Sequence, residues 1–145
     1  MAVETFELRA PVLVRERSLR PDSAGQGEWR GAFGHRLRFS PLPGYNRPVS
    51  FFMNPDRLYF PPLGMAGGEN GPLTRVIVNG QEIAAGEFGS GQVTLETPDD
   101  GLELHLPGGA GYGPPGTREP RLVEADMRSG LVTLERVKAM AGIDH

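Results

Sequence analysis

The 145-residue chain contains no cysteine, which excludes a disulfide framework, a thiolate metal site and a cysteine nucleophile. It also lacks an apolar run long enough to span a membrane and the N-terminal apolar stretch of a signal peptide. The net charge is only −3, and no basic run interleaved with aromatic residues marks a nucleic-acid site. We therefore expect a soluble, cytoplasmic protein with no nucleic-acid or membrane partner.

Apolar residues are also scarce, at 38% of the chain, whereas 21 glycines and 14 prolines are unusually many. The glycines and prolines gather in three passages, 20–34, 60–71 and 106–116, and each passage carries large apolar side chains that disordered chains lack. We expect one domain, residues 1–145, in which these passages pack against one another. Because so few apolar residues must stabilise so much irregular backbone, we also expect burial against a partner surface.

The first passage, 20–34, reads RPDSAGQGEWRGAFG and is the part around which we expect the chain to be organised. Pro21 blocks a helix, and Asp22 favours a turn. Trp29, the only tryptophan of the chain, is predicted to be a large apolar anchor that the assembly depends on. Four glycines are expected to permit backbone angles closed to other residues: Gly25, Gly27, Gly31 and Gly34.

Alternating apolar residues predict short strands between the passages. The Asn79-Gly80 pair predicts a hairpin over 74–83. The other predicted strands are 5–19, as two segments or one edge strand broken at Pro11; 35–39; 49–53, buried on both faces; and 93–97 with 102–106, as a second hairpin. A turn is predicted over 54–57. The fold class is therefore mainly β over residues 3–116, with irregular polyproline II-like segments, in a small β-barrel or sandwich-like body.

The C-terminal residues 118–142 change to a helical pattern and predict an αα-hairpin. Pro120 suits the first turn of a helix, and Ser129-Gly130 suits its end. Thr133 is predicted to cap a second helix, which Gly142 ends.

No residues of this chain assemble a recognisable active site. The glycine-rich passages lack the following helix of a dinucleotide fold and the Gly-Lys-Ser/Thr of a P-loop. His35, His105 and His145 have no ligand spacing, so polar strand histidines are favoured over metal ligands for the first two. On the residues alone, the chain is predicted to be a binding or structural subunit with no catalytic, cofactor-binding or metal residue.

Four arginines, Arg20, Arg30, Arg57 and Arg118, lie within or beside the irregular passages. A guanidinium group can donate to several backbone carbonyls that such passages leave unpaired, and this structural role is favoured. Recognition of a carboxylate or phosphate at a subunit interface is the alternative.

The order of motifs resembles the C-terminal region of the hydantoinase B/oxoprolinase family. The family pattern RPDSGG-G-x-x-RGG-x-G corresponds here to 20–34, R-x-x-x-PP-x-G-x-x-GG to 57–68, TPGGGGYGDP to 106–114, and D-x-x-x-G-x-V-(S/T)-x-E to 126–135. The departures are Ala24, Ala32 and Ala110 in place of glycines, and Pro114 in place of an aspartate.

The resemblance implies an assembly. A-type subunits bind ATP and Mg²⁺ and phosphorylate a carbonyl or bicarbonate oxygen, and the B-type part completes the reaction. Family B-type subunits are much longer, so this chain, which begins at its own Met1, resembles a B-type tail encoded separately. Its expected partners are A-type ATP-binding subunits and a large B-type subunit, and any metal would belong to that large partner.

The resemblance ranks first a small structural subunit of an acetophenone carboxylase-like ketone carboxylase, without catalytic residues of its own. A subunit of an ATP-dependent hydantoinase/oxoprolinase-type amidohydrolase comes second. A stand-alone β-rich binding module and a self-sufficient hydrolase remain as alternatives. The candidate structural or interface residues are Arg20, Asp22, Trp29, Arg30, Arg57, Pro61, Pro62, Gly67, Gly68, Gly111, Tyr112 and Gly113.

Overall fold

The computed structural model of the protein describes residues 2–54, 56–89 and 91–141. Gly142 and His145, both singled out in the sequence, lie outside the described residues. The elements, in chain order, are α1 (Val3–Glu7), β1 (Val12–Leu19), β2 (His35–Pro41), β3 (Val49–Phe52), α2 (Asp56–Tyr59), β4 (Arg75–Val78), β5 (Gln81–Ile83), the 3-10 turn η1 (Ala85–Glu87), β6 (Gln92–Leu95), β7 (Leu102–His105), the 3-10 turn η2 (Pro115–Thr117), α3 (Pro120–Arg128) and α4 (Leu134–Met140).

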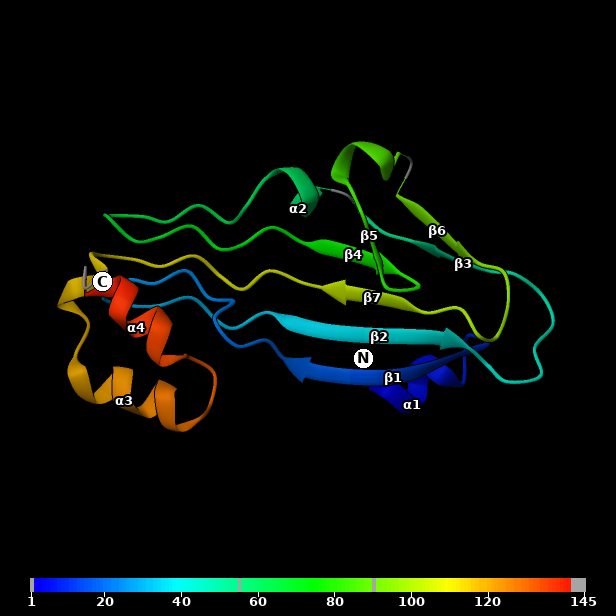
Figure 1. Ribbon diagram of the computed structural model, residues 1–145, viewed down its shortest axis with the longest axis horizontal. Coiled ribbons are helices and arrows are strands. Elements are labelled where there is room, and N and C mark those ends of the chain that lie inside the picture. Colours follow the sequence, from blue (N-terminus) through cyan, green and yellow to red (C-terminus); the bar gives the residue numbers. More distant parts are fainter. Residues whose placement is uncertain (1, 55, 90, 142–145) are drawn as a thin grey trace.

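Two antiparallel sheets make up the body. Five strands form one sheet in the order β1-β2-β7-β4-β5, and β3 pairs with β6 in a second sheet. Since β1 and β5 are the outer strands of the larger sheet, the described strands form no closed barrel. The mainly β fold is thus confirmed, and it takes the open, sandwich-like form. Figure 1 shows β3 and β6 at one end of the molecule and α3 and α4 at the other.

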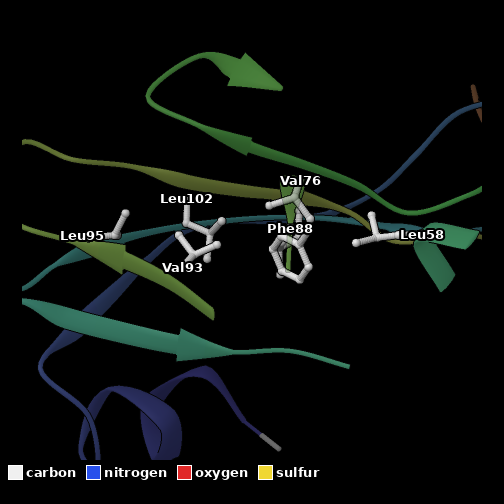
Figure 2. Close-up of a cluster of buried hydrophobic side chains, with 7 residues drawn as sticks. Leu58, Val76, Phe88, Val93, Leu95 and Leu102 are labelled. Atoms are coloured by element: carbon white, nitrogen blue, oxygen red, sulfur yellow. The ribbon is translucent and has the colours of Figure 1, made fainter. Parts of the chain in front are cut away.

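The apolar core lies where the two sheets face each other. Figure 2 shows Val93 and Leu95 of β6 beside Leu102 of β7. Leu104 of β7 and Val76 of β4 belong to the same buried cluster. Strands β6 and β7 bury alternate residues, because successive side chains of a strand point to opposite faces. In β4 only Val76 is fully buried. The short elements α2 and η1 flank this core, to which Leu58 and Phe88 also belong.

The first part of the segment predicted as strand is a helix. Residues Val3–Glu7 form α1, and the strand begins only at Val12. Phe6 of this helix packs on Phe39 of β2 with ring centroids 5.8 Å apart. The Glu7 carboxylate accepts a 2.8 Å hydrogen bond from the main-chain N–H of Val14. The prediction was wrong because the alternation rested on Phe6 and Leu8 alone, and these two side chains do not share a buried face: Phe6 packs on Phe39, whereas Leu8 is 87% exposed.

One of the two predicted hairpins is confirmed. The Asn79-Gly80 turn joins β4 to β5 with positive φ at both residues, 50° and 80°, as a type I′ turn requires. The second predicted hairpin is wrong, because β6 pairs with β3 whereas β7 pairs with β2 and β4. The turn before β7 carries the chain from one sheet to the other. Its Asp100 carboxylate accepts from the main-chain N–H groups of Glu96 and Thr97, both at 2.8 Å.

Strand β3 differs from its prediction as well. It was expected to be buried on both faces, but Ser50 and Phe52 are exposed and only Val49 is fully buried. Val49 and Phe51 share one face, on which Phe51 packs against Phe39 with ring centroids 5.5 Å apart, and Ser50 and Phe52 lie on the opposite, exposed face. The predicted turn over 54–57 is replaced from Asp56 onward by the short helix α2.

The C-terminal αα-hairpin is confirmed within the described residues. Pro120 occupies the first turn of α3, and Gly130, at φ 72°, follows the end of that helix. The Thr133 side chain caps α4 by accepting a hydrogen bond from the main-chain N–H of Arg136 at 3.2 Å. Among the helices of the described residues, none has the length and apolar character needed to cross a bilayer.

Candidate functional site

The three glycine- and proline-rich passages form one layer, which we call the glycine layer. We define it as residues 20–34, 60–71 and 106–114, because the end of the third passage belongs to η2. The passages lie between the strands and the α3–α4 hairpin (Figure 1). They are joined by main-chain hydrogen bonds rather than by a regular strand ladder. The bonds run from Gly25 N to Gly109 O at 2.8 Å, Gly108 N to Ser23 O at 3.0 Å, Gly109 N to Ala32 O at 2.8 Å, Glu69 N to Gln26 O at 2.7 Å and Gly111 N to Glu69 O at 2.8 Å.

Glycine is required in this layer because the backbones touch. A Cβ atom on Gly31 would lie 2.0 Å from the carbonyl oxygen of Gly109, and one on Gly68 would lie 2.2 Å from that of Gly111. These spacings leave no room for any side chain, and the obstructing atoms are backbone that cannot rotate away. The four glycines of the first passage were expected to supply unusual backbone angles, but none of them has a positive φ. These glycines instead allow the backbones of neighbouring passages to lie in direct contact.

Each of the four arginines donates a hydrogen bond to a main-chain carbonyl, as predicted. The pairs are Arg20 Nη1 to Leu106 O at 2.8 Å, Arg30 Nη1 to Gly31 O at 2.9 Å, Arg57 Nη1 to Phe60 O at 3.2 Å and Arg118 Nη1 to Glu28 O at 3.1 Å. The bond from Arg20 joins the first passage to the third. Burial lowers the pKa of Arg20 below its ordinary value, with a smaller contribution from the charge of Arg75.

Two of these arginines also hold the helical hairpin against the layer through one carboxylate. Arg30 donates two hydrogen bonds to the carboxylate of Asp126 on α3, from Nε to Oδ2 at 2.8 Å and from Nη2 to Oδ1 at 2.7 Å. Arg118 adds a third bond from its Nη2 to Oδ2 at 2.9 Å. The Arg30 hydrogen bonds are the main reason that the pKa of Asp126 lies below its usual range. The guanidinium of Arg30 also lies 4.1 Å from the ring centroid of Phe33.

A second group of polar contacts fixes α4 to the same layer. The two carboxylate oxygens of Asp22 accept from Thr133, one from its main-chain N–H at 2.9 Å and the other from its hydroxyl at 2.8 Å. Arg136 of α4 forms an ion pair with Glu69, whose carboxylate also accepts from the main-chain N–H of Gln26 at 3.2 Å. The hairpin is therefore attached at two separate points.

The outer side of the glycine layer carries large apolar side chains. Trp29 is 61% exposed and Tyr112 is 53% exposed, so neither side chain belongs to the core of the chain itself, and the burial of Trp29 against a partner stays a prediction. The other candidate residues belong to the layer or adjoin it: Arg20, Asp22, Arg30, Pro61, Pro62 and Gly68 are half-buried, Gly111 and Gly113 are buried, and Arg57 and Gly67 are exposed. Their assignment as interface residues stays a prediction.

The hydantoinase B/oxoprolinase family model matches residues 1–115, which include all three passages of the glycine layer. The chain belongs to the hydantoinase B/oxoprolinase family. The resemblance seen in the motifs is thereby confirmed. The match ends at the start of η2, so α3 and α4 lie beyond it.

Among curated proteins, the caprolactamase subunit beta of Pseudomonas jessenii is 32% identical over 148 residues, covering 97% of this chain and 24% of its own length. The crystal structure of the ATP-dependent caprolactamase from that organism superposes with a TM-score of 0.71 at 26% identity, covering 94% of this chain and 24% of that one. A nucleotide-free acetone carboxylase has a TM-score of 0.68 at 18% identity, over 97% and 22% of the two chains, and shows the fold alone. The chain spans about a quarter of the length of these relatives.

The family motifs meet in three dimensions. The first three supply the passages of the glycine layer, and the fourth supplies Asp126, which holds the hairpin against it. Among the described residues, no group of three histidine, aspartate or glutamate side chains could hold a metal ion. The His105 ring bonds instead to the Glu103 carboxylate of the same strand. What the layer offers is a fixed backbone framework that displays apolar side chains.

Sequence reasoning missed three residues that position the hairpin: Glu69, Asp126 and Arg136. Asp126 had a signal, since it opens the fourth family motif. Glu69 and Arg136 had none, because an acidic residue in a glycine-rich passage and a basic residue in a helix are both ordinary surface features.

Proposed function

We propose that this chain is a structural portion of the B-type component of a cytoplasmic ATP-dependent enzyme. The observation that carries the proposal is the alignment of 97% of the chain with only 24% of the caprolactamase subunit beta. The chemistry of such a relative draws on a body about four times longer. In this proposal, A-type partners bind ATP and Mg²⁺, a large B-type portion completes the reaction, and our chain supplies the glycine layer and the αα-hairpin.

The substrate class proposed first is a cyclic amide. The caprolactamase relative is 32% identical to our chain, whereas the acetone carboxylase is 18% identical and informs on fold alone. This reverses the order favoured by the motifs, which placed the ketone carboxylase ahead of the amidohydrolase. The ketone carboxylase is the second candidate, supported by the TM-score of 0.68 over nearly the whole chain.

The test begins with reconstitution. The chain is co-expressed with the A-type and large B-type family proteins of its source organism, and the purified complex is assayed for ADP release with caprolactam or 5-oxoproline, and with acetone or acetophenone plus bicarbonate. We expect ATP-dependent hydrolysis of a cyclic amide by the complex and no turnover by the chain alone. Turnover by the isolated chain would refute the structural role. A chain that is folded, monomeric and indifferent to these partners would instead be a stand-alone binding module.

A further inference from the structure

Three exposed apolar side chains form a continuous row across the glycine layer. Trp29 and Tyr112 exchange main-chain hydrogen bonds at 3.0 and 2.8 Å as an antiparallel pair. Met65 is bridged to Tyr112 in the parallel sense, through bonds to Gly111 and Gly113 at 3.1 and 3.0 Å. Directly paired residues on neighbouring extended segments present their side chains on the same face. Each passage of the layer thus contributes one member to this row, which we call the apolar row.

The apolar row is exposed even though its backbone is held firmly. Met65 is 66% exposed, similar to the exposed fractions of Trp29 and Tyr112. Leu63, two residues before Met65, is 71% exposed. Trp and Tyr side chains each bury about 150–250 Å² when fully covered, so Trp29 and Tyr112 together with Met65 offer a patch of several hundred Å². The backbones that carry the row are in direct contact, since a Cβ on Gly68 or Gly111 would lie 2.2 or 1.9 Å from a carbonyl oxygen of a neighbouring passage.

We propose that the apolar row docks onto the part of a B-type body that lies outside this chain. This inference rests on the proposed function and names the contact surface that it requires. The relatives continue for about three quarters of their length beyond the portion that our chain matches. The row also lies within the region matched by the family model, on segments whose glycines the packing requires. The buried centre of a stable protein interface is rich in aromatic and other large apolar side chains, and the apolar row supplies side chains of this kind.

The first experiment is hydroxyl-radical footprinting of the chain alone and in complex with its large B-type partner. Tryptophan, tyrosine and methionine side chains all react readily, and peptides of this chain report each position separately. We expect labelling of Trp29, Met65 and Tyr112 to fall about fivefold in the complex, as full desolvation of such contacts requires. Phe52, which is 75% exposed on β3, is the internal control and should label equally in both states.

The second experiment compares Met65→Glu with the matched control Leu8→Glu. Leu8 is 87% exposed and far along the chain from the layer, so both variants place a carboxylate at an exposed apolar position. We expect the dissociation constant of the purified complex, measured by dilution and mass photometry, to rise about tenfold or more for Met65→Glu only. Tyr112→Ser is the second variant if Met65→Glu lowers the melting temperature of the free chain.

Each outcome decides something different. A complex that forms while the row stays labelled, or that tolerates Met65→Glu as well as Leu8→Glu, overturns the docking surface and leaves the proposed function standing. Self-association of the chain that Met65→Glu abolishes would assign the row to a second copy and also overturn the inference. Failure of any complex to form overturns the proposed function and the docking surface together.

Discussion

Replacing Asp126 with asparagine should weaken the attachment of α3 to the glycine layer, while the contacts of Asp22 and Glu69 still hold α4. The substitution keeps the size of the side chain but removes the negative charge on which two arginines converge. Asparagine can still accept one hydrogen bond through its amide oxygen. Its NH₂ group, however, would face the guanidinium of Arg30 or Arg118, donor against donor.

The magnitude follows from the burial of the three partners. The side chains of Asp126, Arg118 and Arg30 are 11%, 7% and 23% exposed. Removing one partner of a buried ion pair costs about 3–5 kcal/mol, and partial exposure of Arg30 points to the lower end, about 3 kcal/mol. For a chain of this length, about 3 °C of melting temperature corresponds to each kcal/mol, so the loss should be about 9 °C.

Glu124→Gln is the matched control, because Glu124 lies on the same helix and pairs with Arg128 in the solvent, with side chains 64% and 78% exposed. Such an exposed pair contributes about 0.3–0.5 kcal/mol. Differential scanning fluorimetry gives the two melting temperatures, and hydrogen exchange of α3 and α4 shows whether Asp126→Asn opens the hairpin. Equal melting temperatures and equal exchange for the two variants would refute the reasoning.

Two further predictions follow from the same layer. The lowered pKa of Asp126 means that its ionised form stabilises the fold above about pH 4, and this contribution is lost as the pH falls through the folded-state pKa. Melting temperatures of the wild type should therefore fall more steeply than those of Asp126→Asn between pH 5 and 3, and parallel curves would contradict this. Gly111→Ala would place a Cβ 1.9 Å from the Gln26 carbonyl oxygen and should destabilise the fold by about 3 kcal/mol in chemical denaturation. Gly116→Ala, with open space around it, should change little.

Local signals predicted local structure well. The Asn79-Gly80 turn, the cap at Thr133 and the first turn at Pro120 are confirmed because each depends on a few neighbouring residues. The mainly β class follows from alternation and is confirmed as well. The pairing of the strands was harder to predict. Strands β6 and β7 look like a hairpin in the sequence, but they lie in different sheets.

The candidate site was predictable in outline only. Clustered glycines and apolar anchors indicated that the passages pack together, and the arginines were correctly assigned to backbone carbonyls. The sequence could not show that Arg30 selects Asp126, 96 positions away, from 18 acidic residues. Nor could it show that the side chain of Trp29 is exposed. A tryptophan that packs in the core and one that packs against a partner protein look the same in the sequence.

The glycine layer also has a consequence for how the protein reaches its native state. Its three passages are separated by tens of residues, and the main-chain hydrogen bonds that join them, such as Gly25 to Gly109 and Glu69 to Gln26, connect residues far apart in the sequence. Closing such large loops has an entropic cost that no single pairing offsets, so the passages should become ordered together and late. A nascent chain would thus keep its three most open segments available until the last of them has been synthesised, which is the interval in which a chaperone or a waiting partner could engage it.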